Sequence, residues 1–402
     1  MKKRVVVTGL GVVSSLGIGK DDFWENLVQG KSGISEVDAF DTCEYPRHYG
    51  GQVRGFKPGD FIDMGKIEKM GRASQMAIAS ARCAFDETGL NLQWLNKQRI
   101  AVVMGTTAGE SQKIEEANDV WVKQGKDFIN SQTILQSPVN NVSSNVAREF
   151  KITGPTKIFT NACAAGNYAI GYGFDLLQQG KANLVVAGGS DAFSYIAFTG
   201  FSLIRAVAPE KCQPFDKNRK GMIVAEGAAT LILESLDSAL RRGACIYAEI
   251  LGYGLSCDAY HMIAPHYEGM TNCMKNALES TNTNSDEVSY ICAHGTGTFH
   301  NDRAEAKAIK EIFGEKPPPV SSIKSMLGHA MGAASAIEAV ACCLSVKTNI
   351  IVPTINYETP DPECDIDCVP NKARKHTVSI ALNNSFAFGG NNSCLVFKKF
   401  TP

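Results

Sequence analysis

The chain opens with VVVTGLGVVS at residues 5–14, and AEILGYGLS at residues 248–256 follows the same pattern. Each stretch begins with apolar residues typical of a buried strand and passes through glycine, one residue and glycine to a small polar residue. The return of one strand pattern in two distant parts of a chain suits a duplicated fold. The sequence therefore predicts two similar halves, residues 1–250 and 251–402, that meet near residue 250.

Short apolar runs rich in Val and Ile alternate with helical patterns along the rest of the chain. Such runs predict buried strands, and their alternation with helices favours a layered α/β fold. The first strand is expected to end at Thr8, where the glycines begin. Strands are predicted at residues 4–8, 100–104, 184–187, 230–234, 246–252, 290–294, 320–323, 378–383 and 394–397, and the clearest helices at residues 71–88, 165–179 and 332–345.

The composition is that of a globular protein, because 44% of the 402 residues are hydrophobic and 20% are charged. A formal net charge of −1 gives no argument for a nucleic acid or an anionic membrane as partner. Since we find no run of 18 apolar residues, we expect no membrane-spanning helix.

Thirteen cysteines, an odd number without a Cys-x-x-Cys pair, argue against both a disulfide framework and a structural zinc site. Free thiols persist in a reducing compartment, so we expect a cytoplasmic protein.

The segment FTNACAAGNY at residues 159–168 runs from a strand-like stretch through small residues into a helical pattern. Cys163 is therefore expected at a strand-to-helix turn, where the free amides and the positive end of the helix dipole favour an anion. A cysteine in such a place can have a pKa of roughly 3.5–7.5 and react as a thiolate. A buried structural cysteine is the alternative for this position taken alone.

A second segment, AHGTGTFHND at residues 293–302, places His294 at the end of an apolar strand. The glycines that follow let a ligand approach the backbone, and the hydroxyls of Thr296 and Thr298 can bind a polar chain such as a pantetheine amide. His300 and Asp302 suggest a metal site, but no third ligand stands at a useful spacing, so we expect none. The alternative is a structural histidine before a plain turn.

A third segment, KSMLGHAMGAASAIE at residues 324–338, sets His329 before a helix full of small residues. Lys324 and Glu338 have little reason to stand in so apolar a stretch unless they pair with each other or serve a site. A fourth segment, NNSFAFGGNN at residues 383–392, is polar and glycine-rich. It predicts a turn between two strands whose amides can donate to an oxyanion, with a simple hairpin turn as the alternative.

Together and in this order, the four segments resemble the elongating β-ketoacyl-[acyl carrier protein] synthases of the thiolase superfamily, and synthase II in particular. The resemblance covers essentially the whole chain, from residues 7–11 through 214–217 and 258–262 to 388–390. It implies a thiolase fold, a five-layer αβαβα structure built from two duplicated halves, and a homodimer. The N-terminal half would hold the nucleophile Cys163, and the C-terminal half would hold the remaining catalytic residues.

The reaction implied by the resemblance is a decarboxylative Claisen condensation. Cys163 would take an acyl group from a carrier protein, and malonyl-carrier protein would lose carbon dioxide and attack the Cys163 thioester. His294 and His329 would hydrogen-bond the malonyl thioester oxygen, while Lys324, supported by Glu338, would hold the local field. The backbone amides of Cys163 and Phe388 would form the oxyanion hole, and Phe388 would act as a gate between the half-reactions.

No metal or dissociable cofactor is implied, because the phosphopantetheine arrives on the acyl carrier protein. The resemblance places carrier-protein docking near Lys66, Lys69 and Arg205, with an ordinary solvated surface as the alternative. It places Ala108 in the acyl pocket, where a larger aliphatic residue often stands in the family.

Several positions depart from the family pattern. Ala387 stands where glycine is usual, Asn391 stands where threonine is usual, and residues 164–166 lack the common hydroxyl side chains. These changes move the expectation partly towards a ketosynthase of a type II polyketide or polyene pathway. Such an enzyme can work with a non-catalytic chain-length-factor subunit. Since Cys163 and both histidines are present, a non-catalytic role for this chain is disfavoured, and a thiolase is disfavoured because Phe388 replaces its second cysteine.

Overall fold

The computed structural model describes residues 3–91 and 99–401. Within them, eleven strands form one sheet whose order is β11-β10-β14-β15-β9-β1-β8-β7-β5-β6, with β2 paired to β1. The strands are β1 (Val5–Ser14), β2 (Gly17–Ile18), β5 (Ile100–Gly105), β6 (Thr156–Phe159), β7 (Leu184–Asp191), β8 (Gly227–Ser235), β9 (Ala248–Cys257), β10 (Tyr290–Cys292), β11 (Val320–Ser321), β14 (Ile380–Phe386) and β15 (Asn391–Lys398). Two small hairpins pair β3 (Ser35–Glu36) with β4 (Tyr49–Gly50) and β12 (Ile350–Ile351) with β13 (Arg374–Lys375).

The helices surround and divide this sheet. They are α1 (Lys20–Val28), α2 (Met64–Ile67), α3 (Arg72–Thr88), α5 (Ser111–Gln124), α6 (Ser131–Gln136), α7 (Asn141–Glu149), α8 (Ala165–Gln178), α9 (Tyr195–Leu203), α10 (Leu236–Arg241), α11 (Tyr267–Thr281), α12 (Phe299–Phe313), α13 (Lys324–Leu327) and α14 (Ala334–Thr348).

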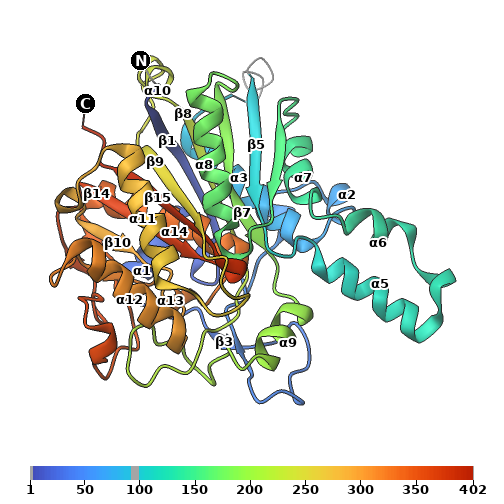
Figure 1. Cartoon of the computed structure of the whole chain (residues 1–402). Coiled ribbons are helices and arrows are strands. Elements are labelled where there is room, and N and C mark those ends of the chain that lie inside the picture. The colour runs from blue at the N-terminus through green and yellow to red at the C-terminus, as the bar shows by residue number, and fades with distance from the viewer. Residues whose placement is uncertain (1–2, 92–98, 402) are drawn as a thin grey trace.

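Two helices lie between the two halves of the strand path (Figure 1). Helices α8 and α14 contact β5, β7 and β8 on one side and β9, β14 and β15 on the other. Helix α3 covers the outer face of β1 and β8, and α11 covers the outer face of β9 and β15. The order is therefore helix, strand, helix, strand, helix, which is the predicted five-layer α/β arrangement.

The recurring glycines have the same structural purpose in both halves. A Cβ added to Gly11 would lie 1.8 Å from the carbonyl oxygen of Ser80 in α3, and one added to Gly254 would lie 2.3 Å from the backbone nitrogen of Ala277 in α11. Each strand thus needs glycine because a helix backbone lies directly on it. Our prediction that the first strand ends at Thr8 was wrong, since β1 runs on through these glycines to Ser14.

The other predicted strands and helices are confirmed to within a few residues, and the strand-like stretch expected before Cys163 is the short strand β6. One further interpretation was wrong. Asn384 and Ser385, which follow the predicted strand 378–383, are fully buried in β14 rather than in a turn, and the Ser385 hydroxyl donates to the carbonyl oxygen of Cys163. The predicted boundary at residue 250 lies inside β9 and stays a prediction.

One segment, Met331–Thr348, has the length and mean hydropathy of a membrane span, although polar and charged residues interrupt it, so it is not the run of 18 apolar residues that we looked for. It is 89% buried, and within it α14 packs between the two layers of strands, so it is a core helix of this fold.

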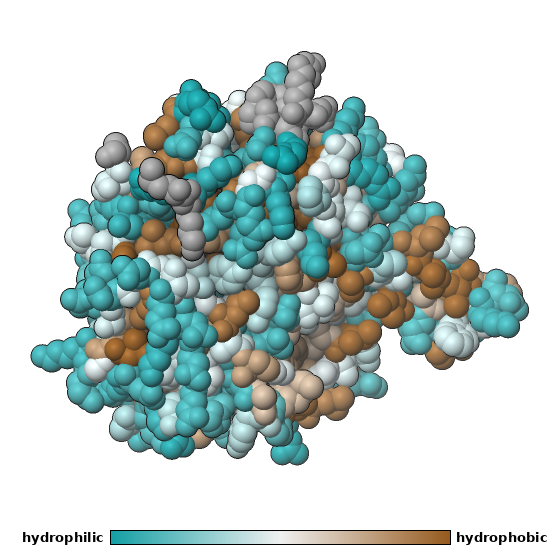
Figure 2. Space-filling view, turned by 45° about the horizontal axis from the view of Figure 1, so that its top comes forward, coloured by the Kyte–Doolittle hydropathy of each residue, from teal (hydrophilic) through white to brown (hydrophobic). Residues whose placement is uncertain are grey.

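Helices α5 and α6 form an arm that projects from the body of the molecule (Figure 1). Figure 2 shows hydrophobic side chains along this arm, and Trp121, Val122, Phe128 and Leu135 are each at least 60% exposed. Strand β6 lies at the end of the sheet, paired only with β5 among the described residues. This side of the molecule therefore presents both an apolar arm and an open strand edge.

Candidate active site

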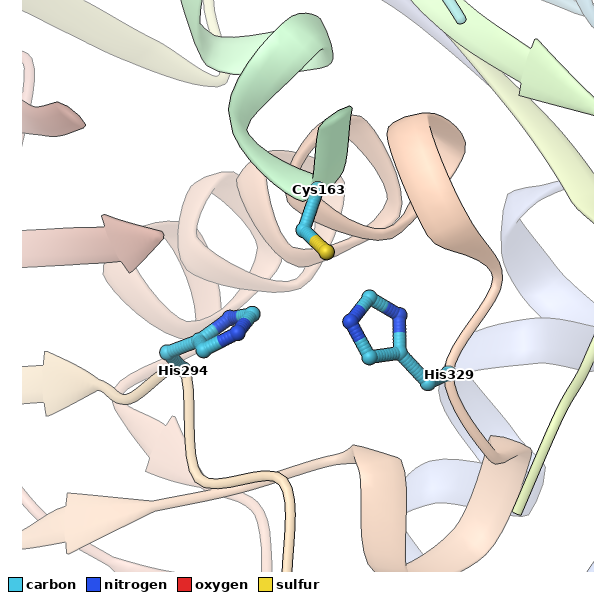
Figure 3. A group of neighbouring side chains, drawn as sticks. All are labelled: Cys163, His294 and His329. Atoms are coloured by element: carbon cyan, nitrogen blue, oxygen red, sulfur yellow. The ribbon is translucent and has the colours of Figure 1, made fainter. Parts of the chain in front are cut away.

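Cys163 lies where the sequence placed it, in the turn between β6 and α8. The turn is tight because Ala162, the residue before the nucleophile, has a φ of 46°, a left-handed conformation that costs free energy in any residue but glycine. The packing of small residues holds it, since Cys163 and Ala164 are buried against Ala387. The thiol lies at the N-terminal end of α8 and points toward His294 and His329 (Figure 3).

The two predicted histidines meet this thiol from separate segments. His294 follows β10, and His329 stands between α13 and α14. The sulfur and one ring nitrogen of each histidine lie within 4.8 Å of one another, and the two rings are 5.4 Å apart at 82°. Figure 3 shows the three side chains pointing toward a common space.

Both imidazoles are neutral at ordinary pH. Burial and the nearby Lys324 ammonium hold the pKa of His329 well below its usual value, and burial, Lys324 and His329 do the same to His294. The Nδ1 of His329 accepts a 3.1 Å hydrogen bond from the backbone N–H of Met331, so its proton is on Nε2. His329 is therefore fixed as a hydrogen-bond donor toward the thiol and the space beside it.

The resting thiol contradicts our expectation of a thiolate. Burial raises the pKa of Cys163 to about 11, although the Lys324 charge and hydrogen bonds from the backbone N–H groups of Phe388 and Cys163 lower it. The sequence argument considered only the helix N-terminus, whereas the thiol is also 94% withdrawn from solvent, its relative exposure being 6%. Cys163 must therefore lose its proton as it attacks, and His294 is the neighbouring base. Its Nδ1 has no hydrogen-bond partner among the described residues, whereas the Nδ1 of His329 already accepts from Met331 and its Nε2 carries the proton.

Lys324 and Glu338 form the predicted ion pair, with both side chains 1% exposed. Burial raises the pKa of Glu338 to about 7, because the attraction of Lys324 only partly offsets desolvation. The second carboxylate oxygen of Glu338 has no hydrogen-bond partner among the described residues. The pair holds a cation beside the histidines, which keeps them neutral.

Phe388 lies in the loop between β14 and β15, half-buried, and its ring packs 5.6 Å from that of Phe201 in α9. The loop is tied to residues 257–263, since the N–H of Gly389 donates to the carbonyl of Met262 at 2.8 Å. Two of its backbone amides, those of Ala387 and Gly390, bond within the loop. The amide of Phe388 faces the Cys163 sulfur instead, as an oxyanion donor must.

A cavity of about 410 Å³ opens above these groups. Cys163, His294, His329 and Phe388 line it, and so do Thr296 and Thr298, whose hydroxyls are 2.8 Å apart. A space of this size accommodates a ligand of drug-like dimensions.

Not every predicted residue reaches this cavity. Ala108 is absent from its lining and donates its backbone N–H to Asp191 at 3.0 Å. Arg205 lines the mouth, and Lys66 and Lys69 are exposed on the surface beyond it. Lys66 forms a 2.8 Å ion pair with Glu149, whereas the described residues offer Lys69 no acidic partner.

Two buried carboxylates that support the site escaped the sequence analysis. Glu305 accepts 2.8 Å hydrogen bonds from the backbone N–H groups of His294 and Gly295. Asp191 accepts from Thr106, Thr107, Ala108 and Gly332, which ties the 106–108 loop to the start of the segment after His329. The only signal for them was an acidic residue in an otherwise buried segment.

Cys163, His294 and His329 are close enough to share a metal ion. The ammonium of Lys324 and the raised pKa of the thiol disfavour a cation there, so our expectation of no metal stays a prediction. His300 and Asp302 do not form a site either, because Asp302 is fully buried against Phe215 and Arg219 while His300 is exposed.

Comparison with known proteins agrees with this geometry. The Beta-ketoacyl synthase N-terminal domain family matches residues 2–239, and its C-terminal domain family matches residues 247–358. The chain belongs to the β-ketoacyl synthase family. It is a ketosynthase of the acyltransferase class with the thiolase fold.

Curated relatives cover the whole chain. It is 40% identical to the 3-oxoacyl-[acyl-carrier-protein] synthase 2 of Coxiella burnetii and 39% identical to that of Synechocystis, with 99% of each chain covered. Among solved structures, the ishigamide ketosynthase/chain length factor is similar at a TM-score of 0.97 and 41% identity, with both chains fully covered. A type II polyketide synthase ketosynthase, solved in complex with its acyl-carrier protein, is similar at 0.92 and 33%, again with full coverage.

Proposed function

We propose that this ketosynthase extends acyl chains by decarboxylative Claisen condensation with malonyl-[acyl carrier protein]. The observation that carries the proposal is the convergence of the Cys163 sulfur with two neutral histidines at the floor of one cavity. A nucleophile and two hydrogen-bond donors in one small space are what acyl transfer followed by carbanion formation requires.

The first half-reaction transfers the acyl group. The Cys163 sulfur attacks the thioester carbonyl of an acyl-carrier protein, its proton passes by way of a neighbouring histidine to the departing phosphopantetheine thiol, and an acyl-Cys163 thioester forms. The negative charge on the carbonyl oxygen is held by the amides of Cys163 and Phe388. One such donor is worth roughly 3 kcal/mol in acyl-transfer sites.

The second half-reaction makes the carbon–carbon bond. The malonyl group loses carbon dioxide, and the electron pair left behind forms an enolate whose oxygen accepts hydrogen bonds from His294 and His329. That carbanion attacks the acyl-Cys163 carbonyl, the sulfur leaves as a thiolate and takes up a proton, and β-ketoacyl-carrier protein is released. Lys324 contributes positive charge, and Phe388 opens the acyl side between the two steps.

The phosphopantetheine arm would enter past Thr296 and Thr298, which line the cavity. The arm belongs to the carrier protein, so the enzyme itself would need no cofactor. We assign carrier docking to Lys66, Lys69 and Arg205, and we place the acyl chain in a pocket bordered by Ala108. We expect the protein in the cytoplasm.

A partner subunit is expected on the side formed by the arm of α5 and α6 and the edge strand β6. An apolar arm and an open strand edge are costly to leave in water, and a second subunit would cover both. A homodimer is the first candidate. A heterodimer with a chain-length-factor subunit is the second, because the ishigamide ketosynthase/chain length factor is 41% identical to this chain. A heterodimer with a chain-length-factor subunit would indicate a polyketide or polyene pathway.

Intact-mass analysis after mixing with acyl-carrier proteins of different chain types tests the proposal. We expect a gain of one acyl group that disappears in Cys163→Ala, and the preferred acyl group separates fatty-acid from polyketide or polyene synthesis. Adding malonyl-carrier protein should then release a β-ketoacyl product. A folded wild-type protein that no donor acylates, alone or with a chain-length-factor subunit, would overturn the proposal.

A further inference from the structure

The charged and titratable residues that line the cavity are all basic or neutral. Arg205, Arg219 and Lys220 line it together with four histidines, and no Asp or Glu of the described residues does so. The chain as a whole carries a formal net charge of −1. A cavity without acidic residues in a nearly neutral protein favours an anionic ligand.

Arg219 is not available to that ligand. Its guanidinium is fully buried, pairs with Asp361 and lies 3.8 Å from Asp302, and it stacks 5.0 Å from the ring of Phe299. Its charge is therefore already compensated, and Arg219 shapes the wall rather than binding a ligand.

Lys220 and Arg205 differ from Arg219 in both burial and ion pairing. Both side chains are exposed at the mouth, and neither has an acidic partner within the parts of the chain that are described. Lys220 directly follows the anchored Arg219, so its backbone position is fixed although its side chain is free. Two uncompensated cations on separate segments at one opening form a cationic mouth.

His300 adds a third basic group from another element. It stands in the first turn of α12, a helix of 15 residues whose N-cap, Thr298, makes no side-chain cap. The Thr298 hydroxyl bonds to Thr296 instead. The helix dipole at this end of α12 reinforces the attraction of Lys220 and Arg205 for an anion, and Asp302, the acidic residue of the first turn, is buried beside Arg219.

We propose that Lys220, with Arg205 and His300, binds the phosphodiester of the phosphopantetheine arm at the cavity mouth. The inference rests on the proposed function, and it adds a phosphate site to it. The arm is a chain with its thiol at one end and its phosphodiester at the other. When the thioester lies at Cys163 on the floor, the phosphodiester remains toward the opening, where the free cations are. A malonyl carboxylate, the other anion of the reaction, belongs to the floor.

The test uses two acyl donors without carrier protein, an acyl-pantetheine and the same acyl group on 4′-phosphopantetheine. They differ only in the phosphate, so neither protein docking nor the malonyl carboxylate contributes. The rate of Cys163 acylation is measured by intact mass for the wild type and Lys220→Glu. We expect Lys220→Glu to slow acylation by the phosphorylated donor about tenfold while leaving the pantetheine donor unchanged, because an exposed charge reversal acts on the anion alone.

Lys217→Glu is the matched control, because Lys217 is exposed three residues earlier and is absent from the cavity lining. It should leave both rates unchanged, and Lys220→Arg should retain the preference for the phosphorylated donor. Equal rates for the two donors in the wild type, or an equal effect of Lys220→Glu on both, would overturn the phosphate site. If acyl-carrier protein also fails to acylate the wild type, with or without a chain-length-factor subunit, the proposed function fails instead.

Discussion

At the floor of the cavity, Lys324 and its counter-ion Glu338 are sealed from solvent, whereas at the mouth two cations stand in water with no acidic partner among the described residues. Lys324 and Glu338 are each 1% exposed and paired, and the histidines above them are neutral because they are buried and because the Lys324 ammonium lies nearby. Arg205 and Lys220 are exposed, and the described residues offer them no acidic partner. The floor is built to stabilise charge that develops during reaction, and the mouth to attract charge that arrives with the substrate.

This difference sets the size of the effects that substitutions should have. In a dry site a lost hydrogen bond to a developing anion is not replaced by water, so the free-energy cost is large. At an exposed rim, solvent and salt screen each charge, and a single pair contributes little. Three sets of substitutions, at the two histidines, at Lys324 and at Lys69, test whether the size of the effect falls from the floor outward.

The largest effect is expected for His294→Ala and His329→Ala. Each should slow release of β-ketoacyl product by roughly 10²–10³-fold, because each removes one donor to the enolate oxygen. The oxyanion hole for acyl transfer uses backbone amides, so acylation of Cys163 should remain detectable by intact mass. The double variant should be little slower than either single variant, since two donors that serve one oxygen act as a unit.

His48→Ala is the control for these variants, because His48 is exposed and lies outside the cavity lining, and its ring bonds to the Thr42 hydroxyl. It should condense at the wild-type rate. The contrary outcome is that a histidine variant loses acylation and that its condensation rate falls by no more than its acylation rate. The histidines would then serve only the first half-reaction.

The sequence predicted the residues at the floor of the cavity better than those at its mouth or in its support. Cys163, His294 and His329 were predictable because each stands at the end of an element among small residues, a local pattern that needs no partner to be seen. The protonation state of Cys163 was mispredicted because burial is a property of the fold, not of the segment. Lys220 and Glu305 were not singled out, because their importance depends on segments distant in sequence that the fold brings beside them.

The fold itself shows the same limit. Glycines in β1 indicated the end of the strand until α3 was seen to lie on them, and Asn384 and Ser385 indicated a turn until their burial in β14 was seen. Local chemistry was correct in both cases, and the packing of a second element decided the outcome.

A smaller effect is expected for Lys324→Met, measured as the pH dependence of iodoacetamide alkylation of Cys163. The Lys324 ammonium lowers the pKa of the thiol, against the larger effect of burial, which raises it to about 11. Removing the ammonium should therefore raise the pKa further, so that alkylation is severalfold slower at any pH below about 11. Circular dichroism checks that the variant is folded, since Glu338 loses its partner.

Lys347→Met serves as the matched control, because Lys347 stands on α14, which also carries Glu338, but bonds to the carbonyl of Ile246 away from the cavity. Its alkylation profile should match the wild type. Faster alkylation in a folded Lys324→Met protein would mean that Lys324 does not favour the thiolate, and the contrast between floor and mouth would lose its electrostatic basis.

The smallest effect is expected outside the mouth, at Lys69. Its side chain is exposed and has no acidic partner within the described parts of the chain, whereas neighbouring Lys66 is already paired with Glu149. If Lys69 contacts an acidic carrier protein, Lys69→Glu should raise the KM for acyl-carrier protein a few-fold, and more at low ionic strength than at high, because the interaction is solvent-exposed. Acylation by acyl-pantetheine should not change. Lys372→Glu, a charge reversal at an exposed lysine before β13, should change neither the KM for acyl-carrier protein nor the acylation by acyl-pantetheine.

A salt-independent loss of acylation with both donors would mean that Lys69→Glu impairs folding rather than docking. A loss as large as that of the histidine variants would mean that surface charge, not the buried floor, controls turnover.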